Sequence, residues 1–151
     1  MSAALHLAGP EDLGALLPMV TACHDYEDIE SDDARREAAL APLLEGSPLG
    51  CVYLVGPRRA PVGYIVITFG WSVEFGGMEG FIDEFFIREN VRGRGMGSEV
   101  LLKLIPQLES AGLMALHLEA SQDRPRLQKL YARAGFRLRD GYALMTRTRK
   151  A

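Results

Sequence analysis

The stretch ENVRGRGMGSEVLL, residues 89–102, alternates glycine with larger residues and then continues as an apolar helix pattern. Glycine weakens a helix interior, so Gly93, Gly95 and Gly97 need a reason to stand where a helix begins. The first turn of a helix leaves backbone N–H groups unpaired, and the helix dipole adds partial positive charge there. Because glycine has no Cβ, an anion can approach these groups closely. The stretch therefore predicts a loop that binds a phosphate or a pyrophosphate.

The loop contains two arginines, and its glycine spacing excludes two common phosphate-binding motifs. Arg92 and Arg94 add full positive charge to the same loop. A Walker A loop requires Gly-Lys-Ser/Thr, and this loop contains no lysine. A Rossmann fingerprint starting at Gly93 would need glycine at position 98, where Ser98 stands. The alternative is a tight strand-to-helix turn whose glycines only permit close packing.

The composition is typical of one globular domain spanning residues 1–151, with 48% hydrophobic and 25% charged residues. A net charge of −3 argues against a nucleic-acid partner. Neither a signal peptide nor a membrane span is expected, so a cytoplasmic location is predicted. Cys23 and Cys51 form no Cys-x-x-Cys pair, and His6 and His24 have no ligand spacing, so no metal site is expected and both histidines are assigned structural roles.

Hydrophobic periodicity predicts a mixed α/β fold, with helices packed on a largely antiparallel sheet. The expected order is β-α-α-β-β-β-α-β-α-β-β. Ser31 is the expected N-cap of the second helix. The predicted strands and helices are, in order, a strand at 4–8, helices at 13–24 and 31–46, strands at 51–55, 62–69 and 81–87, a helix after the glycine loop, a strand within 111–120, a helix at 124–135 and a hairpin at 136–148.

Two separate motifs resemble those of the GNAT superfamily of N-acetyltransferases. FFIRENVRGRGMG is similar to the family's acetyl-CoA signature, Arg/Gln-x-x-Gly-x-Gly/Ala, with Arg92, Gly95 and Gly97 at the defining positions. LEASQDRPRLQKLYARAGF resembles the second signature, and both occur in the family's order. The resemblance implies a GNAT-type fold that uses acetyl-CoA as cosubstrate and needs no metal.

The resemblance also assigns roles at the cofactor. Tyr131 would protonate the departing thiolate, although an amphipathic helix also commonly buries a tyrosine for packing. Arg124 stands where the family often has asparagine, and it could contact a phosphate. The remaining cofactor residues are Phe85, Phe86 and Ile87 for the pantetheine arm, and Arg92, Gly93, Arg94, Gly95, Met96, Gly97 and Ser98 for the pyrophosphate.

An amine must lose a proton before it attacks a thioester, and three carboxylates are candidate bases. Asp83 and Glu84 lie in the strand before the loop, and Glu119 ends the next strand. Period-two alternation sends Asp83 and Glu84 to opposite faces, so at most one lines the site unless a bulge intervenes. A structural salt bridge, or a base that acts through ordered water, remains an alternative for each.

The acceptor is predicted from charge and from a closer resemblance. HDYEDIESDD, residues 24–33, is either a solvated acidic surface or a region that attracts a cationic substrate. The stretch at 81–104 is similar to diamine (spermidine/spermine) and thialysine acetyltransferases, which implies a homodimer with the hairpin at 136–148 as its pairing edge. The implied substrate contacts are Tyr26, Glu27, Asp83, His117 and Glu119, with Leu118 along the channel and Trp71, Ser72 and Glu74 as further candidates.

These observations predict an acetyl-CoA-dependent N-acetyltransferase that acts on a primary amine of a small cationic molecule, such as a polyamine or thialysine. Two alternatives remain at this point. One is an acetyltransferase for protein N-termini or lysines, which would need a peptide-sized groove. The other is a non-catalytic module that binds acyl-CoA without turnover.

Overall fold

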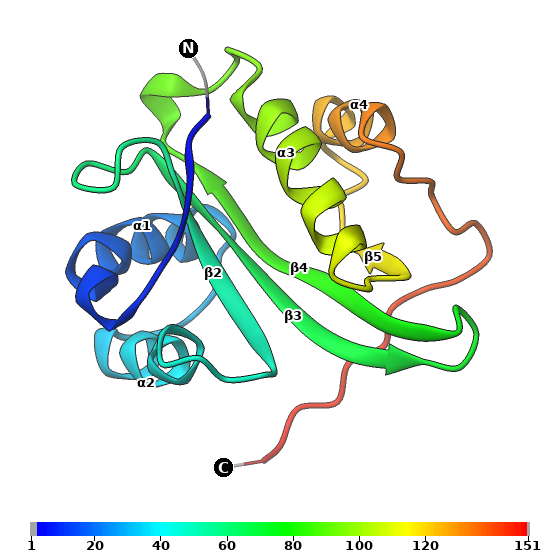
Figure 1. Cartoon of the computed structure of the whole chain (residues 1–151), viewed down its shortest axis with the longest axis horizontal. Coiled ribbons are helices and arrows are strands. Elements are labelled where there is room, and N and C mark those ends of the chain that lie inside the picture. The colour runs from blue at the N-terminus through cyan, green and yellow to red at the C-terminus, as the bar shows by residue number, and fades with distance from the viewer. Residues whose placement is uncertain (1–2, 151) are drawn as a thin grey trace.

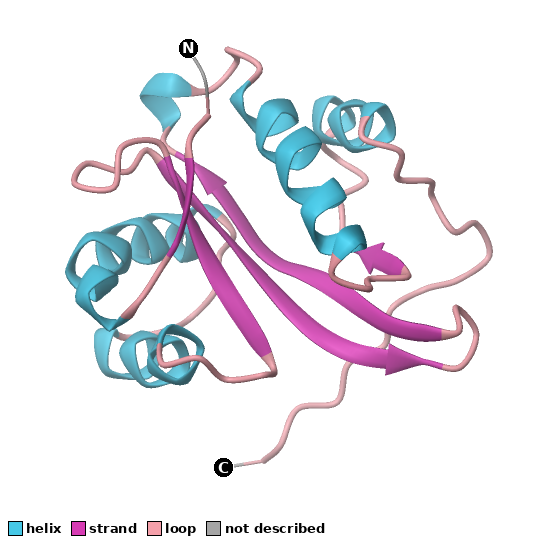
Figure 2. Cartoon of the chain, in the orientation of Figure 1, coloured by secondary structure: helices cyan, strands magenta, loops and turns pink. Residues whose placement is uncertain are grey.

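The structure, a computed structural model, describes residues 3–150 and contains a five-stranded sheet with helices on both faces (Figure 1, Figure 2). The strand order is β1-β2-β3-β4-β5, and every neighbouring pair is antiparallel except β4 and β5. The elements are β1 (Leu5–Leu7), η1 (Pro10–Asp12), α1 (Leu13–Tyr26), α2 (Asp33–Leu44), β2 (Gly50–Val55), β3 (Gly63–Ser72), β4 (Gly77–Ile87), η2 (Glu89–Val91), α3 (Met96–Ser110), β5 (Ala115–His117) and α4 (Pro125–Arg133).

Alternation along β3 explains why both faces of the sheet are covered. Tyr64 and Val66 pack with α1 and α2 in one buried cluster, whereas Ile65 and Ile67 pack with α3 in another. Each of these four side chains is at most 3% exposed. A central strand that is apolar on both faces needs a layer of helices on each side. The result is a rigid centre that fixes where β4 ends.

The predicted mixed α/β fold is confirmed, and the predicted element order is confirmed as far as α4. Two details are wrong. Asp32, not Ser31, caps α2, because its carboxylate accepts a hydrogen bond from the Arg35 backbone N–H at 2.8 Å. Residues 136–150 form no hairpin and contain no strand. Arg139 of this segment instead forms an exposed ion pair with Glu74, in the β3–β4 turn, at 2.9 Å.

Candidate active site

The sheet opens between β4 and β5. Parallel pairing joins Glu79, Gly80 and Phe81 of β4 to the three residues of β5 and stops there. β4 continues for six more residues, to Ile87, while the chain after β5 turns towards α4. The two neighbouring strands therefore separate, and α3 and α4 lie above the gap (Figure 1). Residues 82–87 of β4 therefore have no paired strand on the β5 side.

A β-bulge lies beside the opening. The pairing register shifts between Val66 and Ile67, which face Glu84 and Ile82 respectively, so Asp83 is an extra residue on β4. A bulge breaks strict alternation and re-aims the side chains next to it. The bulge that the sequence analysis left open is therefore present. Asp83 is exposed, and Glu84 turns towards α1.

Glu84 belongs to a hydrogen-bond network on the α1 side of the sheet. Its carboxylate is 2.6 Å from His24 Nε2 and accepts a hydrogen bond from the Tyr64 hydroxyl at 2.7 Å. The other ring nitrogen of His24 is 2.6 Å from Ser31 Oγ, which also accepts from Arg36 at 2.6 Å. Charged hydrogen bonds of this kind fix a carboxylate firmly. The network holds Glu84 in one orientation.

Asp83 has a different environment from its neighbour. Partial desolvation, followed by the like charges of Glu84 and Glu119, raises the pKa of Asp83, and the weaker effect of His24 opposes this. The three carboxylates that the sequence analysis named as bases are thus close enough to influence one another. A carboxyl with a raised pKa is a better proton acceptor when ionised, which suits it to general base catalysis.

The glycines of the loop have two distinct roles. Gly93 and Gly95 adopt positive φ, at 79° and 76°, where other residues are strained, and Gly95 is the N-cap of α3. A Cβ on either would meet nothing within 4 Å, so their surroundings are open. Gly97 instead lies against α4, because a Cβ there would come within 3.2 Å of Leu130 Cδ1. The tight turn and the close packing, which the sequence analysis gave together as the alternative to an anion-binding loop, are both present.

Within the described residues, no side chain caps the N-terminus of α3. The first-turn N–H groups of an α-helix have no intrahelical partner, and the dipole adds positive charge at the same point. Arg94 is exposed on this loop. The geometry therefore fits an anion with several oxygens, such as the pyrophosphate of coenzyme A.

Tyr26 is stacked between two arginines at the end of α1. The guanidinium of Arg92 is 4.9 Å from its ring centroid, and that of Arg124 is 4.5 Å away. Arg124 also forms an ion pair with Glu27 at 2.8 Å, and Arg92 donates to the Ile87 carbonyl at 2.6 Å. These contacts connect the acidic stretch to the glycine loop and to the N-terminus of α4.

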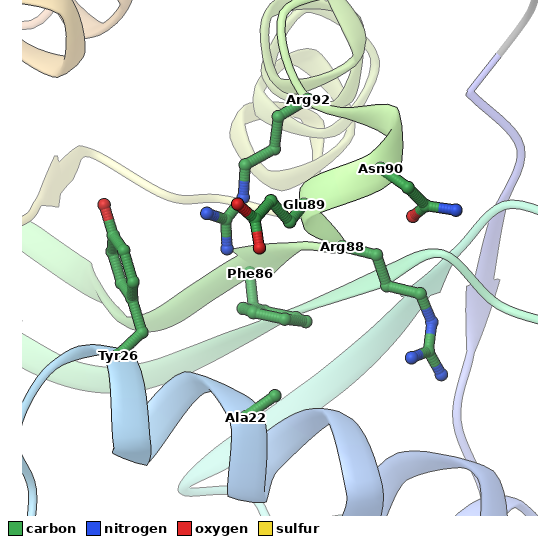
Figure 3. A pocket seen from close by; sticks show the side chains of 7 residues that line it. All are labelled: Ala22, Tyr26, Phe86, Arg88, Glu89, Asn90 and Arg92. Atoms are coloured by element: carbon green, nitrogen blue, oxygen red, sulfur yellow. The ribbon is translucent and has the colours of Figure 1, made fainter.

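A pocket of about 710 Å³ lies where α1, the end of β4 and the loop meet (Figure 3). Arg92 reaches over Phe86 towards Tyr26, with its guanidinium 5.3 Å from the Phe86 ring centroid (Figure 3). Three polar lining residues, Arg88, Glu89 and Asn90, were not predicted, although they directly precede the glycine loop in the sequence. The full lining is Ala22, Tyr26, Phe86, Arg88, Glu89, Asn90 and Arg92.

Tyr131 lies on α4, half-buried against the α3 side of the core, with its ring edge-on to Phe136 at 5.9 Å. Burial and, to a lesser extent, the charge of Glu27 raise the pKa of its phenol. The hydroxyl therefore stays protonated at neutral pH, as a proton donor must. Cys23 is not a nucleophile here, because burial raises the pKa of its thiol to about 11.

The other predicted substrate residues separate into two groups. His117 Nε2 lies 2.8 Å from Glu79 Oε1, beside a smaller pocket of about 220 Å³ on the sheet. Ser72 and Glu74 lie at the β3–β4 turn with Trp71, which is 74% exposed, and Glu74 is paired with Arg139. The structure does not place Trp71, Ser72 and Glu74 beside the candidate bases on β4. Sequence reasoning also gave His24 only a structural role, because nothing in the sequence signals its contact with Glu84.

Among the residues that the structure describes, no group of three or more His, Cys, Asp or Glu side chains is arranged to hold a metal ion. In the same part of the chain, no helix has both the length and the apolar character needed to cross a bilayer.

Comparisons with known proteins give the following matches. A family model described as acetyltransferase (GNAT) family matches residues 15–136. A search of curated proteins found no match. Among solved structures, an integron cassette protein from the mobile metagenome of Cole Harbour Salt Marsh is 29% identical, with a TM-score of 0.83 over 97% of this chain and 91% of that one.

Two other solved structures are similar in fold. One, described as a probable acetyltransferase, is 16% identical, with a TM-score of 0.84 over 98% of this chain and 99% of that one. The other is a ribosomal-protein-alanine N-acetyltransferase from Brucella melitensis biovar Abortus, 18% identical, with a TM-score of 0.76 over 98% of this chain and 100% of that one. At these identities the likeness concerns the fold alone.

Proposed function

The chain belongs to the acetyltransferase (GNAT) family, and from that premise we propose that it transfers an acetyl group from acetyl-CoA to a primary amine of a small cationic molecule. Polyamines and thialysine are the acceptor class that fits best. The observation that carries the proposal is Asp83 beside the opening between β4 and β5, where the negative charges of Glu84 and Glu119 help to raise its pKa.

The opening and the glycine loop together fit the cofactor. The edge of β4 from Phe85 to Ile87 lies beyond the last residue paired with β5, so its backbone groups would pair with the amides of the pantetheine arm. The N-terminus of α3, with Gly93 and Gly95 in the left-handed conformation, would hold the pyrophosphate. Acetyl-CoA supplies the acetyl thioester when it is bound.

Three residues of the chain would act on protons and charge. Asp83 would take the proton of the ammonium, because its raised pKa suits it to act as a general base. Glu84, fixed by His24 and Tyr64, would hold the cationic acceptor in place. Tyr131 would protonate the leaving thiolate, and a β4 backbone N–H would stabilise the oxyanion.

The charge around the opening supports a cationic acceptor. The chain from His24 to Asp33 carries six carboxylates, and the ion pairs of the described residues offset two of them, Glu27 with Arg124 and Asp33 with Arg36. Glu79 and Glu119 add negative charge on the other side. A surface with one sign of charge raises the local concentration of opposite charge and speeds its association. A neutral amine would gain nothing from it.

The test is acetyl transfer measured by CoA release and by the mass of the product. The acceptors are polyamines, thialysine, amino acids, aminoglycosides and peptides, including peptides that begin with alanine. A diamine and a monoamine with equal carbon chains form the matched pair. We expect a lower KM for the diamine, and a smaller difference at high salt. Turnover with peptides alone would replace the proposed acceptor, and no turnover with any amine would favour a binding module.

A further inference from the structure

A second pocket lies on the sheet, away from the glycine loop and from the pantetheine edge of β4. Its volume is about 220 Å³, and residues of β3, β4 and β5 line it. The lining includes the carboxylate of Glu79, the imidazole of His117 and the ring of Phe81. A concave site where a few polar groups converge on an apolar wall is typical of ligand binding.

The polar groups of this pocket are on the α1 face of the sheet. A Cβ at Gly80 would come within 3.1 Å of Leu116, which packs in the α3 cluster, so Gly80 faces α3. Alternation along β4 therefore directs Glu79 and Phe81 to the opposite face. His117 is the register partner of Phe81 and lies beside it. At this end of the sheet β3 and β4 extend beyond α1 and α2, which leaves room for a ligand (Figure 1).

Glu79 is the carboxylate of the pocket, and His117 holds it in place. Glu79 Oε1 lies 2.8 Å from His117 Nε2, and the Glu79 side chain is 32% exposed. The His117 ring in turn packs against Phe75, with ring centroids 5.4 Å apart. A carboxylate has about four acceptor positions on its two oxygens, so Glu79 can accept a hydrogen bond from a ligand while it keeps His117 as a partner.

The surroundings of Glu79 suit an alkylammonium group. Phe81 offers an aromatic ring beside the carboxylate. Aromatic faces attract cations, and a hydrogen bond between an ammonium and a carboxylate is stronger than one between neutral groups. The nearby cation, Arg139, contacts Phe75 at 5.4 Å and is paired with Glu74 at 2.9 Å. Glu79 thus remains the negative charge that a cationic ligand in the pocket would meet.

The pocket lies at a fixed distance from the proposed base. Asp83 follows Glu79 by four residues on the same strand, which corresponds to about 13 Å at about 3.3 Å per residue. Asp83 is exposed, and the charge of His24 on α1 affects it, so Asp83 is also accessible from the α1 face. One extended molecule can therefore reach both carboxylates along the strand.

This distance restricts which acceptors reach both carboxylates. A fully extended chain advances about 1.2 Å per bond, so putrescine, with five bonds between its nitrogens, spans only about 6 Å. The ten-carbon α,ω-diamine has eleven such bonds and spans about 13 Å. Spermidine and spermine, with nine and thirteen bonds between their outer nitrogens, lie on either side of this length.

We propose that this pocket is a second ammonium subsite of the acceptor site. Glu79 and Phe81 hold the amine at the far end of the acceptor while the near amine is acetylated beside Asp83. His117 is a positioning residue that acts through Glu79. The subsite rests on the proposed function, because it needs a reacting amine at Asp83. It selects long diamines and polyamines over putrescine and over amines with a neutral far end.

The test compares acceptors that differ only at the far end. Each α,ω-diamine is paired with the amino alcohol of the same carbon chain, and kcat/KM is measured by CoA release. With ten carbons, the diamine should be preferred by about tenfold or more, the usual effect of a hydrogen bond to a charged group. With four carbons, the ratio should be close to the statistical factor of about two for two equivalent amines.

Glu79→Gln should remove the preference for the ten-carbon diamine. The ratio of the two kcat/KM values does not depend on how much of a variant is folded, because both acceptors meet the same enzyme. Glu109→Gln is the matched control, since it makes the same charge change at an exposed position of α3 on the other face. His117→Ala should lose most of the preference, whereas His117→Gln, which keeps a donor for Glu79, should retain part of it.

The outcomes separate the subsite from the proposed function. Acetylation of the ten-carbon diamine and its amino alcohol at equal kcat/KM would overturn the subsite and leave the proposed function in place. A preference that Glu109→Gln lowers as much as Glu79→Gln would also overturn it, because long-range charge would then explain the effect. No acetylation of any amine would overturn both.

Discussion

His24 Nε2 lies 2.6 Å from Glu84 Oε2, although the two residues are sixty positions apart and come from α1 and β4. Both side chains are mostly buried, at 12% and 18% exposed. The contact connects α1, whose last turn begins the acidic residues 24–33, to β4, which lines the opening. A carboxylate held in this way keeps its position, while Asp83 beside it is exposed.

Replacing His24 with alanine should destabilise the protein by about 1–3 kcal/mol, because Glu84 loses a partner in a mostly buried place. Chemical denaturation measures this change. His6→Ala is the control, since His6 is also partly buried but contacts no carboxylate of the site, and we expect a change within about 0.5 kcal/mol. In the double variant with Glu84→Gln, the two losses should be less than additive. Additive losses would mean that the contact is not energetically coupled.

Asp83→Asn should lower kcat/KM by about 10²-fold or more, the usual contribution of a general base. The wild-type rate should fall as the pH drops through the raised pKa of Asp83, at a higher pH than an ordinary aspartate would give. Glu119→Gln removes one neighbouring like charge, so it should shift this limb of the pH profile downwards. Glu109→Gln, an exposed carboxylate of α3, should leave the profile unchanged.

Asp83→Asn should also stabilise the folded protein at neutral pH. A carboxyl whose pKa is raised by folding favours the folded state while it is protonated, and that contribution is lost as the pH rises through the folded pKa. Ionised Asp83 therefore opposes folding near pH 7. Asp83→Asn should raise the Tm at pH 7 and have less effect at acidic pH. An unchanged Tm at both values would argue against the like-charge environment.

Local patterns predicted the parts of this protein that depend on neighbouring residues. Gly93 and Gly95 predicted the turn before α3, and hydrophobic periodicity predicted the helices as far as α4. What alternation could not give was the bulge at Asp83, because a register shift depends on the partner strand. The contact of His24 with Glu84 was missed for the same reason.

Residues 136–150 show where a local pattern predicted structure that is not present. Their alternation is strand-like, but a strand needs an edge, and residues 136–150 do not lie on the edge of their own sheet. The hairpin predicted at 136–148 is therefore wrong, because alternation along a segment gives no information about which sheet edge can pair with it.

Tyr131→Phe should lower kcat by about 10²-fold while leaving the affinity for CoA nearly unchanged, because it removes only the proton donated to the thiolate. Tyr53→Phe is the matched control, since burial also raises the pKa of Tyr53, which lies on β2. Initial rates and calorimetric titration with CoA measure the two quantities. A loss of CoA affinity at constant kcat would assign Tyr131 to binding. Wild-type protein that binds CoA without turnover would indicate a binding module.

Gly95→Ala should weaken CoA binding about tenfold or more. Gly95 has a φ of 76°, and a residue with a Cβ costs about 1–2 kcal/mol in this left-handed conformation. The chain would relieve this strain by rotating the backbone, which would turn the N–H groups at the start of α3 away from the pyrophosphate. Gly14→Ala is the control, because Gly14 lies within α1 with no atom near its Cβ position; it should stabilise the protein by about 0.5–1 kcal/mol and leave CoA binding unchanged. Gly97→Ala, whose Cβ would lie 3.2 Å from Leu130 Cδ1 and 3.8 Å from Phe85 Cζ, should have an intermediate effect. If all three variants bound CoA as the wild type does, the backbone of the loop would not be the pyrophosphate site.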